Sequence, residues 1–422
     1  MSSRPRVLVI GGSVGGLFAA HLLSSIGWDV QVFERSAGDL ASRGAGIGAT
    51  DALCAVMQRI GVPLDASYGI RIRSRRCLDR NGNVVAEVPG GGRATAWSRV
   101  YRALKDALPA DRYHFNRPVT RVDQDAHGVI AEFTDGARTE GDLLIAADGL
   151  ESTVRRQLLT SVEPSYAGYV AWRGVVDGRD TPTEIQARFF EDIIFCFPER
   201  ELLLAMPNPG AGDDRNPEGR RYYFVWYRPV DLDDALPQLC TDSSGRQHGV
   251  TIPPPLIRRE VIQDLKASAE HLLPAQIAAV VHRTQQPLLQ AIFDLESPQV
   301  VFGRVALLGD AAFVARPHVA AGVTKAALDA QSLVHALAAS PGDLDGALTH
   351  YGDEQRHFGS RLVARARLLG AHLEAHRIQS ETGSDTLGKW MPENYMREYG
   401  AGDLIAERYD QLANGPGGHR NA

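Results

Sequence analysis

The segment Gly11-Gly12-Ser13-Val14-Gly15-Gly16 follows a short apolar run and opens a stretch with helical spacing. A glycine turn between a buried strand and a helix leaves backbone amides and the positive end of the helix dipole open to a phosphate group. Glu34 ends the next apolar run, Val30–Phe33, where its carboxylate could accept hydrogen bonds from a ribose. This pattern favours dinucleotide binding over a purely structural turn, although Ser13 replaces the second glycine of the usual fingerprint.

A second polar cluster comes directly after the apolar strand Leu143–Ala147 and runs from Asp148 to Arg156. Its residues leave two interpretations open. Asp148 and Gly149 could contact a cofactor. Alternatively, Asp148 or Ser152 could cap a helix whose arginines lie on a solvated face.

A third cluster begins with Gly309-Asp310 after the apolar strand Val301–Leu308. Asp310 could bind a polyol, and the small residues before a helix that begins near Thr324 would let its positive end face an anionic ring. The alternative is a packed strand-turn-helix capped by Asp310. His318, in the connecting loop, could accept a proton near neutral pH or simply hydrogen-bond that loop.

The elements that must position these clusters can be read from hydrophobic patterning. Val7–Ile10, a helix through Leu17 and Leu22, and Val30–Phe33 predict a βαβ unit, and Val119–Phe133 predicts a β-meander. The middle of the chain predicts a mostly antiparallel sheet with the strands Val170–Val176, Ala187–Phe197, Leu202–Met206 and Tyr222–Tyr227. The region from Thr324 to about Ala375 is predicted to be helical.

The return of an apolar strand at Val301 makes the first domain discontinuous. We predict an α/β fold with a Rossmann-like domain formed by residues 1–70, 96–165 and 296–375. A mostly antiparallel β-sheet domain, formed by residues 71–95 and 166–295, is inserted into it. Residues 376–422 form a C-terminal extension, and from Asn414 the composition is that of a disordered tail.

Composition excludes several functional classes. The 51 acidic and 45 basic residues give a net charge of -6, which argues against nucleic acid or an anionic membrane as the main partner. The four cysteines form no CxxC pair, and no metal-ligand or hydrolase motif occurs in the sequence. The sequence also has no apolar stretch of 18 or more residues, so we expect a cytoplasmic, soluble protein without a metal or a redox disulfide.

Taken together, the order of the three clusters resembles that of the group A FAD-dependent aromatic hydroxylases, the family of para-hydroxybenzoate hydroxylase. The resemblance covers nearly all of the first 375 residues and implies a GR2-type FAD-binding domain, an inserted substrate-binding sheet and a helical C-terminus. The sequence departs from the family pattern at Ser13, at Phe313, where histidine is common, and at Ala320, where glycine is usual.

The resemblance also implies which residues contact FAD. Gly11, Ser13, Val14 and Gly15 would lie along the pyrophosphate, and Glu34 with Arg35 would hold the adenosine ribose. Asp148 and Gly149 would face the pyrophosphate and the route of the nicotinamide cofactor, and Asp310 would bind the ribityl chain. The flavin pyrimidine edge would meet Ala321, Gly322, Val323 and Thr324. Arg102 falls in a helix that lends an arginine to FAD, although Trp97 occupies the position where that arginine often sits.

On the substrate side, the family pattern implies catalytic roles for Pro317, His318 and Arg221. It implies that the pocket for a small aromatic ring is lined by Tyr169, Arg173, Tyr223 and His318.

The activity implied is hydroxylation of a hydroxylated N-heteroaromatic ring, similar to a dihydroxypyridine, through a flavin C4a-hydroperoxide formed with NADH or NADPH and O2. A phenol or hydroxybenzoate ring is an alternative substrate. A reductase of isoprenoid chains and an FAD-binding protein without turnover are alternatives from other classes. We expect a homodimer, because the helical region past Leu368 and the extension from Trp390 offer apolar surface.

Overall fold

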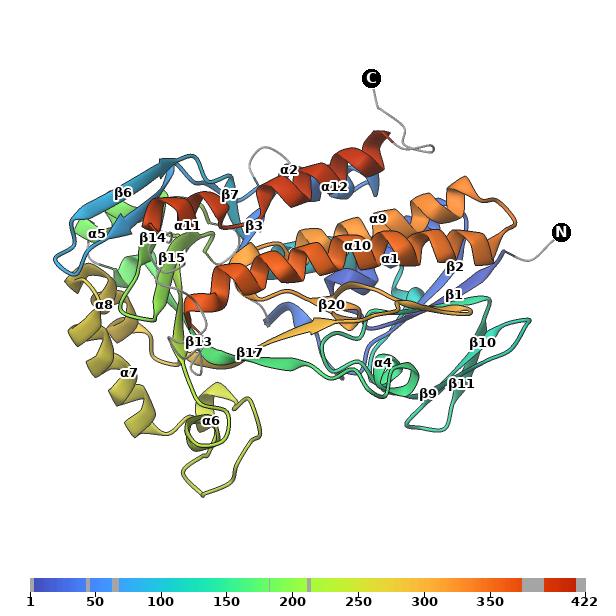
Figure 1. Cartoon of the computed structure of the whole chain (residues 1–422), viewed down its shortest axis with the longest axis horizontal. Helices are drawn as coiled ribbons and strands as arrows, with labels where there is room; N and C mark the ends of the chain where they lie inside the picture. The colour runs from blue at the N-terminus through green and yellow to red at the C-terminus, as the bar shows by residue number, and fades with distance from the viewer. Residues whose placement is uncertain are drawn as a thin grey trace, which may run out of the picture.

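A computed structural model describes residues 4–42, 46–62, 68–181, 183–210, 214–373 and 391–414. The molecule is elongated, with a parallel sheet at one end and a larger antiparallel sheet at the other (Figure 1). Two long helices, α9 (Gly322–Ala339) and α10 (Leu344–Gly370), run along it and pack against each other. The α/β fold class is thus confirmed.

The first sheet has six strands in the order β18-β19-β12-β1-β2-β8. These are β18 (Val301–Phe302), β19 (Val305–Leu307), β12 (Leu143–Ala146), β1 (Arg6–Ile10), β2 (Asp29–Phe33) and β8 (Tyr113–His114). All neighbours are parallel except β18 and β19. Helix α1 (Val14–Ser25) packs against both the sheet and α9, so β1 is buried on both faces, as a continuous apolar run requires.

The second sheet has eight strands in the order β20-β17-β13-β16-β15-β14-β5-β6. These are β20 (Phe313–Val314), β17 (Leu288–Glu296), β13 (Ser165–Asp177), β16 (Arg221–Pro229), β15 (Leu202–Asn208), β14 (Asp192–Cys196), β5 (Ser74–Leu78) and β6 (Val84–Pro89). Along β16 the residues alternate: Tyr222, Phe224 and Trp226 pack in a core that includes α7 (Arg259–Leu272) and α8 (Ala275–Arg283). The opposite face of β16 is left to form a wall of the site.

Two predictions for this region were incomplete or wrong. The expected strand Ala187–Phe197 is helix α5 (Thr183–Phe189) followed by β14. A short apolar run does not by itself distinguish helix from strand. The change from helix to strand is complete at Asp192, a buried residue that forms ion pairs with Arg73 and Arg76. Helices α6 (Ala235–Leu239), α7 and α8 were not foreseen. The predicted meander is confirmed as β9 (Val119–Gln124), β10 (Val129–Phe133) and β11 (Arg138–Gly141).

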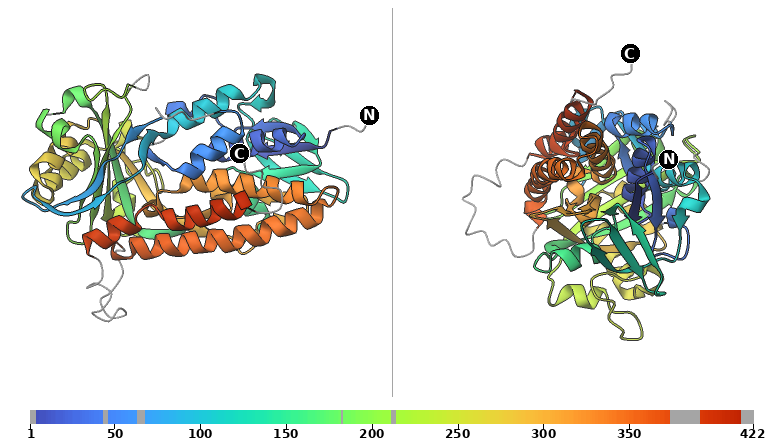
Figure 2. Two further views of the ribbon diagram at one scale, coloured as in Figure 1. Left: turned by 90° about the horizontal axis from the view of Figure 1, so that it is seen from above. Right: turned by 90° about the vertical axis from the view of Figure 1, so that its right-hand side faces the viewer.

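The remaining elements lie between the two sheets or along one side. A small sheet has the order β3-β7-β4, with β3 (Gly46–Ala49), β7 (Arg93–Ala96) and β4 (Ile70–Arg71), and leads into α2 (Asp51–Arg59) and α3 (Trp97–Ala107). Helices α11 (Pro392–Glu398) and α12 (Gly402–Asn414) lie beside α9 and α10 (Figure 2). Residues 376–390 and 415–422 of the predicted extension lie outside the described residues. Within the described part, no helix has the length and apolarity to cross a membrane.

Candidate active site

The glycine turn after β1 is held by contacts that only glycine permits. Gly11 has φ of +106°, and a Cβ atom there would lie 2.3 Å from the carbonyl oxygen of Ala147. A Cβ on Gly16 would lie 1.9 Å from the Gly11 oxygen. The backbone of the turn can therefore approach a ligand closely, as a pyrophosphate site requires.

Glu34 joins this turn to the end of β2. Its buried carboxylate accepts hydrogen bonds from the Gly12 amide and the Ser36 amide, both at 2.8 Å. The two bonds fix the carboxylate at the mouth of the turn, where the sequence pattern predicts a ribose contact. Glu34 thus has a structural role even without a ligand.

A cavity of about 290 Å³ opens beside the turn. Among the residues predicted to contact the cofactor, it is lined by Gly11, Ser13, Glu34, Arg35, Asp148 and Gly149. Trp97 and Arg117 also line it, whereas Arg102 is exposed on α3 and does not. The indole at position 97 therefore occupies the place expected for the arginine, and Arg117 was not foreseen because it follows a loop with no motif of its own.

The second cluster is both a cap and a cavity wall. The Asp148 carboxylate accepts from the Thr153 amide at 2.8 Å, and the Ser152 hydroxyl accepts from the Arg155 amide at 2.9 Å, so both cap α4 (Thr153–Leu158). Burial raises the pKa of Asp148, whose Oδ1 atom has no hydrogen-bond partner in the described part of the chain. This orphaned oxygen beside the glycine turn is an acceptor available to a ligand.

Arg155 links the second cluster to the third, and does not lie on a solvated face. Its side chain is fully buried and donates to the carbonyl oxygens of Leu150 and Ala311. Arg156, in contrast, is exposed and pairs with Glu151. The arginine pair therefore divides into a structural bridge between two loops and a surface residue.

In the third cluster, a buried ion pair holds the turn that carries Asp310. Lys325 Nζ lies 2.6 Å from Asp329 Oδ2 and donates to the Gly309 oxygen, while the Gly309 amide donates to the same Asp329 oxygen. Asp310 opens into a cavity of about 920 Å³, and desolvation raises the pKa of its carboxyl. The turn thus presents a carboxylate at a fixed position.

The N-terminus of α9 faces the same cavity. Pro317, Ala321, Gly322 and Val323 line it, and Thr324 bonds through its hydroxyl to Thr50 at 3.0 Å, joining the starts of α9 and α2. The first amides of a helix have no intrahelical acceptor and carry partial positive charge. Of the predicted segment 321–324, residues 321–323 therefore form a cavity wall suited to an anionic edge, whereas Thr324 is buried behind it.

Ala320, just before this helix, has φ of +44°. The left-handed conformation costs an L-residue about 1–2 kcal/mol, whereas glycine adopts it freely and loses about 0.5–1 kcal/mol through greater unfolded-state entropy. We expect Ala320→Gly to raise the free energy of unfolding by about 0.5–1 kcal/mol. Denaturant titration would measure this, with Ala321→Gly, at φ of -113°, as a control expected to lose stability. A loss in both variants would contradict the interpretation.

The far wall of the cavity comes from the antiparallel sheet, Tyr399 and α12. Arg173 on β13 donates to the Tyr223 hydroxyl and, through Nε, to Gln290 at 2.9 Å. Desolvation would lower the pKa of Arg173, but the surrounding tyrosines, Tyr223 and Tyr227, raise it overall. Arg75 and Tyr399 complete this polar end. It is a positively charged pocket floor surrounded by hydroxyl groups.

Tyr399 was not predicted, because nothing in its local sequence marks it. It follows α11 and reaches the cavity only through the packing of the C-terminal helices, with Arg75 lying 5.9 Å from its ring centre. Arg75 likewise lies on an ordinary strand and donates to the Met396 oxygen. Tertiary structure alone brings these two residues to the site.

The structure does not bring His318 to the cavity surface. The imidazole is fully buried, with Nε2 2.8 Å from the Tyr169 hydroxyl and Nδ1 2.9 Å from the Tyr395 hydroxyl. Desolvation, together with His372 and Arg316, lowers its pKa well below the usual value. His318 and Tyr169 therefore form a buried network behind the cavity wall, and the partners of the His318 ring lie on β13 and α11 rather than in its own loop.

The buried histidines make the fold sensitive to acid. Desolvation lowers the pKa of His372 from 6.5 to about 4. Between these two pH values His372 is therefore protonated in the unfolded chain but neutral in the folded protein. The contribution of His372 to the free energy of unfolding is complete above pH 6.5 and falls on acidification, by about 3 kcal/mol at pH 4. We expect the stability of His372→Phe to change less with pH than that of the wild type. Urea titrations at pH 7, 5.5 and 4.5 would test this, and equal slopes for both proteins would refute it.

Arg221 also lies apart from the cavity. It begins β16 and pairs with Asp177 at 2.9 Å, with 43% of its side chain exposed. It shares a strand face with Tyr223, but it does not line either of the two cavities described above. The geometry gives the polar end of the cavity to Arg173 instead.

These features fit an FAD molecule. The glycine turn approaches closely, the orphaned Asp148 oxygen and fixed Glu34 carboxylate lie at its mouth, and Asp310 and the α9 N-terminus face a larger cavity further on. A dinucleotide with a flavin ring needs this sequence of contacts.

Comparisons with known proteins agree with this geometry. Residues 4–229 match the family described as "FAD binding domain", and residues 166–294 match "FAD binding domain-like". The chain is 31% identical over 389 residues to 2,6-dihydroxypyridine 3-monooxygenase of Paenarthrobacter nicotinovorans, covering 92% of this chain and 96% of that protein. This chain belongs to the FAD-dependent aromatic-ring monooxygenases.

Other relatives of the monooxygenase act on varied rings, according to their names. This chain is 29% identical to 6-hydroxynicotinate 3-monooxygenase of Pseudomonas fluorescens, over 80% of this chain and 83% of that protein. The solved structure of 2,6-dihydroxypyridine-3-hydroxylase from Arthrobacter nicotinovorans superposes with a TM-score of 0.82, covering 91% and 96% of the two chains at 31% identity. The names of these relatives describe oxygenation of a dihydroxypyridine and of a hydroxynicotinate.

Proposed function

We propose that the monooxygenase hydroxylates a small hydroxylated pyridine, in the first instance a dihydroxypyridine, at the expense of NADH or NADPH and O2. The observation that carries this is the polar end of the 920 Å³ cavity, where Arg173, Tyr223 and Gln290 form one hydrogen-bonded group. The pyridine-hydroxylating relatives support the choice of ring.

FAD would be held by Gly11, Ser13, Val14, Gly15, Glu34, Arg35, Asp148, Gly149 and Asp310, with the α9 N-terminus at the flavin. When bound, it would take a hydride from the nicotinamide and supply activated oxygen to the substrate ring. The first amides of α9 would stabilise negative charge on the flavin pyrimidine edge without reorganisation. Asp310 would accept hydrogen bonds from the ribityl hydroxyls.

Substrate activation would fall to Arg173 and Tyr223. Because the Tyr223 oxygen accepts from Arg173, its own proton remains free to donate to a substrate oxygen. The guanidinium favours the ionised form of a ring hydroxyl, and an ionised hydroxyl makes the ring more nucleophilic. The apolar residues Ile193, Leu204, Val225 and Ile292 line the rest of this wall and exclude water from it.

A carboxylated hydroxypyridine is a second candidate. Arg75 and Arg173 place two guanidinium groups at the same cavity, which suits a substrate with a carboxylate as well as an ionised hydroxyl. The hydroxynicotinate-hydroxylating relatives are consistent with it.

The test begins with the visible spectrum of the purified protein, which should show bound flavin. NADH and NADPH oxidation, O2 uptake and product mass would then be followed with 2,6-dihydroxypyridine, 6-hydroxynicotinate and 4-hydroxybenzoate. Stimulated uptake with a hydroxylated dihydroxypyridine is the expected result. Hydroxylation of only another ring would reassign the substrate. Turnover without O2 would indicate a reductase, and bound flavin without any stimulation would indicate a protein that does not turn over.

A further inference from the structure

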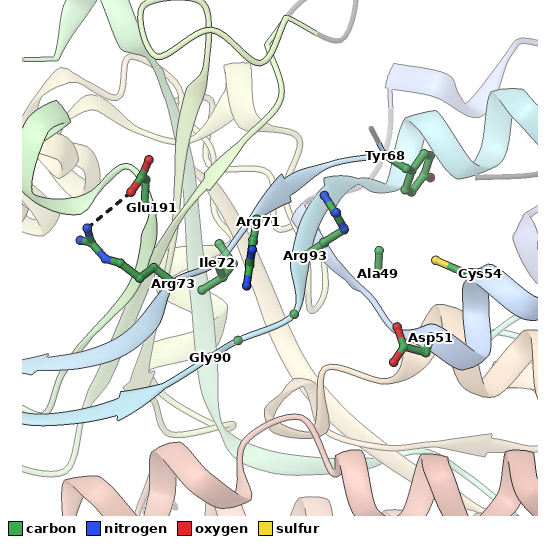
Figure 3. A pocket seen from close by; sticks show the side chains of 12 residues that line it. Ala49, Asp51, Cys54, Tyr68, Arg71, Ile72, Arg73, Gly90, Arg93 and Glu191 are labelled. Carbon is green, nitrogen blue, oxygen red and sulfur yellow. Dashed lines mark ion pairs between the residues drawn. The ribbon is translucent and has the colours of Figure 1, made fainter. Parts of the chain in front are cut away.

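A second large cavity lies between the small β3-β7-β4 sheet and the start of α2 (Figure 3). We call this cavity, of about 770 Å³ and lined among others by Ala49, Asp51, Arg71, Arg93 and residues 90–92, the vestibule. None of the residues predicted from the sequence to bind FAD or substrate lines it. Its contents are therefore a separate question.

Two arginines lie on neighbouring strands in the wall of the vestibule. Arg71 on β4 and Arg93 on β7 are direct partners in the antiparallel ladder, which places them on the same face of the sheet. Like charges opposite each other in a sheet are unfavourable. Within the described part of the chain neither arginine forms an ion pair, whereas Arg73 nearby pairs with Glu191 and Asp192. The pair thus holds two positive charges that no carboxylate of the described chain neutralises.

The vestibule is continuous with the flavin cavity. Ala49, Ile72, Arg93 and the glycine turn at residues 90–92 line both. A Cβ on Gly91 would lie 2.4 Å from Ile72, and Gly90 and Gly92 have positive φ. The turn therefore packs closely against Ile72, and without side chains of its own it leaves the passage between the cavities open. A ligand could therefore reach from the arginine pair to the flavin.

The positive charge and the size of the vestibule indicate which ligand it would bind. A single substrate ring needs only the polar end of the inner cavity, leaving the vestibule unused. A reduced nicotinamide dinucleotide must bring its ring to the flavin while its phosphates stay further out. Since the chain has a net charge of -6, it needs a local positive site to attract such an anion. Asp51, across the vestibule in Figure 3, offers an acceptor for ribose hydroxyls.

We propose that Arg71 and Arg93 bind the phosphate groups of NADH or NADPH as its nicotinamide reaches the flavin through the vestibule. This rests on the proposed function, since only a nicotinamide-dependent reaction requires such a site. Bidentate guanidinium–phosphate contacts provide the affinity and the orientation.

The experiment uses FAD-loaded protein and the probe ADP-ribose, which carries the pyrophosphate without the nicotinamide. Calorimetric titration of Arg71→Gln and Arg93→Gln should show about tenfold weaker binding each, and the double variant a larger loss. Anaerobic flavin reduction should show the same shift in Kd for NADH or NADPH, with the limiting rate preserved. Arg138→Gln, a distant exposed arginine on β11, should match the wild type.

Two further readouts separate this role from others. Because the arginine pair repels itself, the single variants should unfold at the same or a higher temperature, whereas a structural arginine would lower it. The Kd of the ring substrate, followed by the flavin spectrum, should not change. Unchanged ADP-ribose binding, or a loss confined to ring binding, would overturn the proposal. If no ring stimulates turnover while ADP-ribose binding still depends on the arginines, the proposed function fails and this site stands.

Discussion

Asp310→Ala is expected to give a folded protein that purifies without the yellow flavin colour. The carboxylate opens into the cavity beside the α9 N-terminus, where it would accept hydrogen bonds from the ribityl chain. Two hydrogen bonds to a charged acceptor contribute about 3–6 kcal/mol, so FAD affinity should fall by roughly 10²-fold or more. Fluorescence titration of apoprotein with FAD would measure the change.

The pH dependence of this site follows from the raised pKa of Asp310. In the apoprotein the folded state favours the protonated form of Asp310. The stability that this form contributes is lost as the pH rises from the unfolded pKa through the folded pKa. The alanine variant should therefore melt no lower than wild-type apoprotein at pH 7. In the loaded protein, acidification should weaken FAD binding in the wild type but not in Asp310→Ala. A variant that stays fully yellow would remove Asp310 from the site.

The second large effect is expected at the polar end of the cavity. Arg173→Met and Tyr223→Phe should each lower kcat/KM for the ring substrate by about 10²-fold, because each removes a charge-assisted hydrogen bond to the ionising hydroxyl. FAD binding should stay unchanged. Rapid-reaction kinetics with the preferred ring would separate binding from turnover.

Arg221→Gln is the matched control for Arg173, since both are arginines on neighbouring strands of one sheet. Its ion pair with Asp177 is exposed, and such pairs contribute about 0–1 kcal/mol, so the variant should retain near-wild-type turnover. If Arg221→Gln lost more activity than Arg173→Met, the assignment of the polar end would be reversed and the family-based expectation for Arg221 restored.

The segments that form the proposed cofactor half of the site could be located in the sequence because their signals are local. The turn at Gly11, the carboxylate after β2 and the Gly309-Asp310 turn are each a strand end followed by a helix, and a short window of sequence contains the whole pattern. The structure places the first two segments at one cavity and Asp310 at another, with the adjacent residues Gly149 and Leu150 lining one cavity each. The local sequence could not decide whether Arg102 contacts the cofactor. Arg102 and Trp97 lie about one helical turn apart, and which of the two faces the cavity depends on how the helix is oriented.

The substrate half depends on contacts between distant segments. His318 lies in the expected loop, yet its burial is decided by Tyr169 on β13 and Tyr395 on α11, which no local pattern connects. Tyr399 and Arg75 reach the cavity in the same way. Alternation along β16 correctly separates its two faces, but which face meets the cofactor follows only from how the two sheets join.

The contribution of Tyr399 and α12 to the cavity has a consequence for biosynthesis. The glycine turn that would receive FAD leaves the ribosome first, whereas the residues that close the substrate end come from the last described helices. The nucleotide fold itself is completed only when β19 and α9 have emerged, so a nascent chain can form it before its reaction chamber is closed. Cleavage by a protease ahead of α11 would recreate that immature state and leave a flavin site open to solvent.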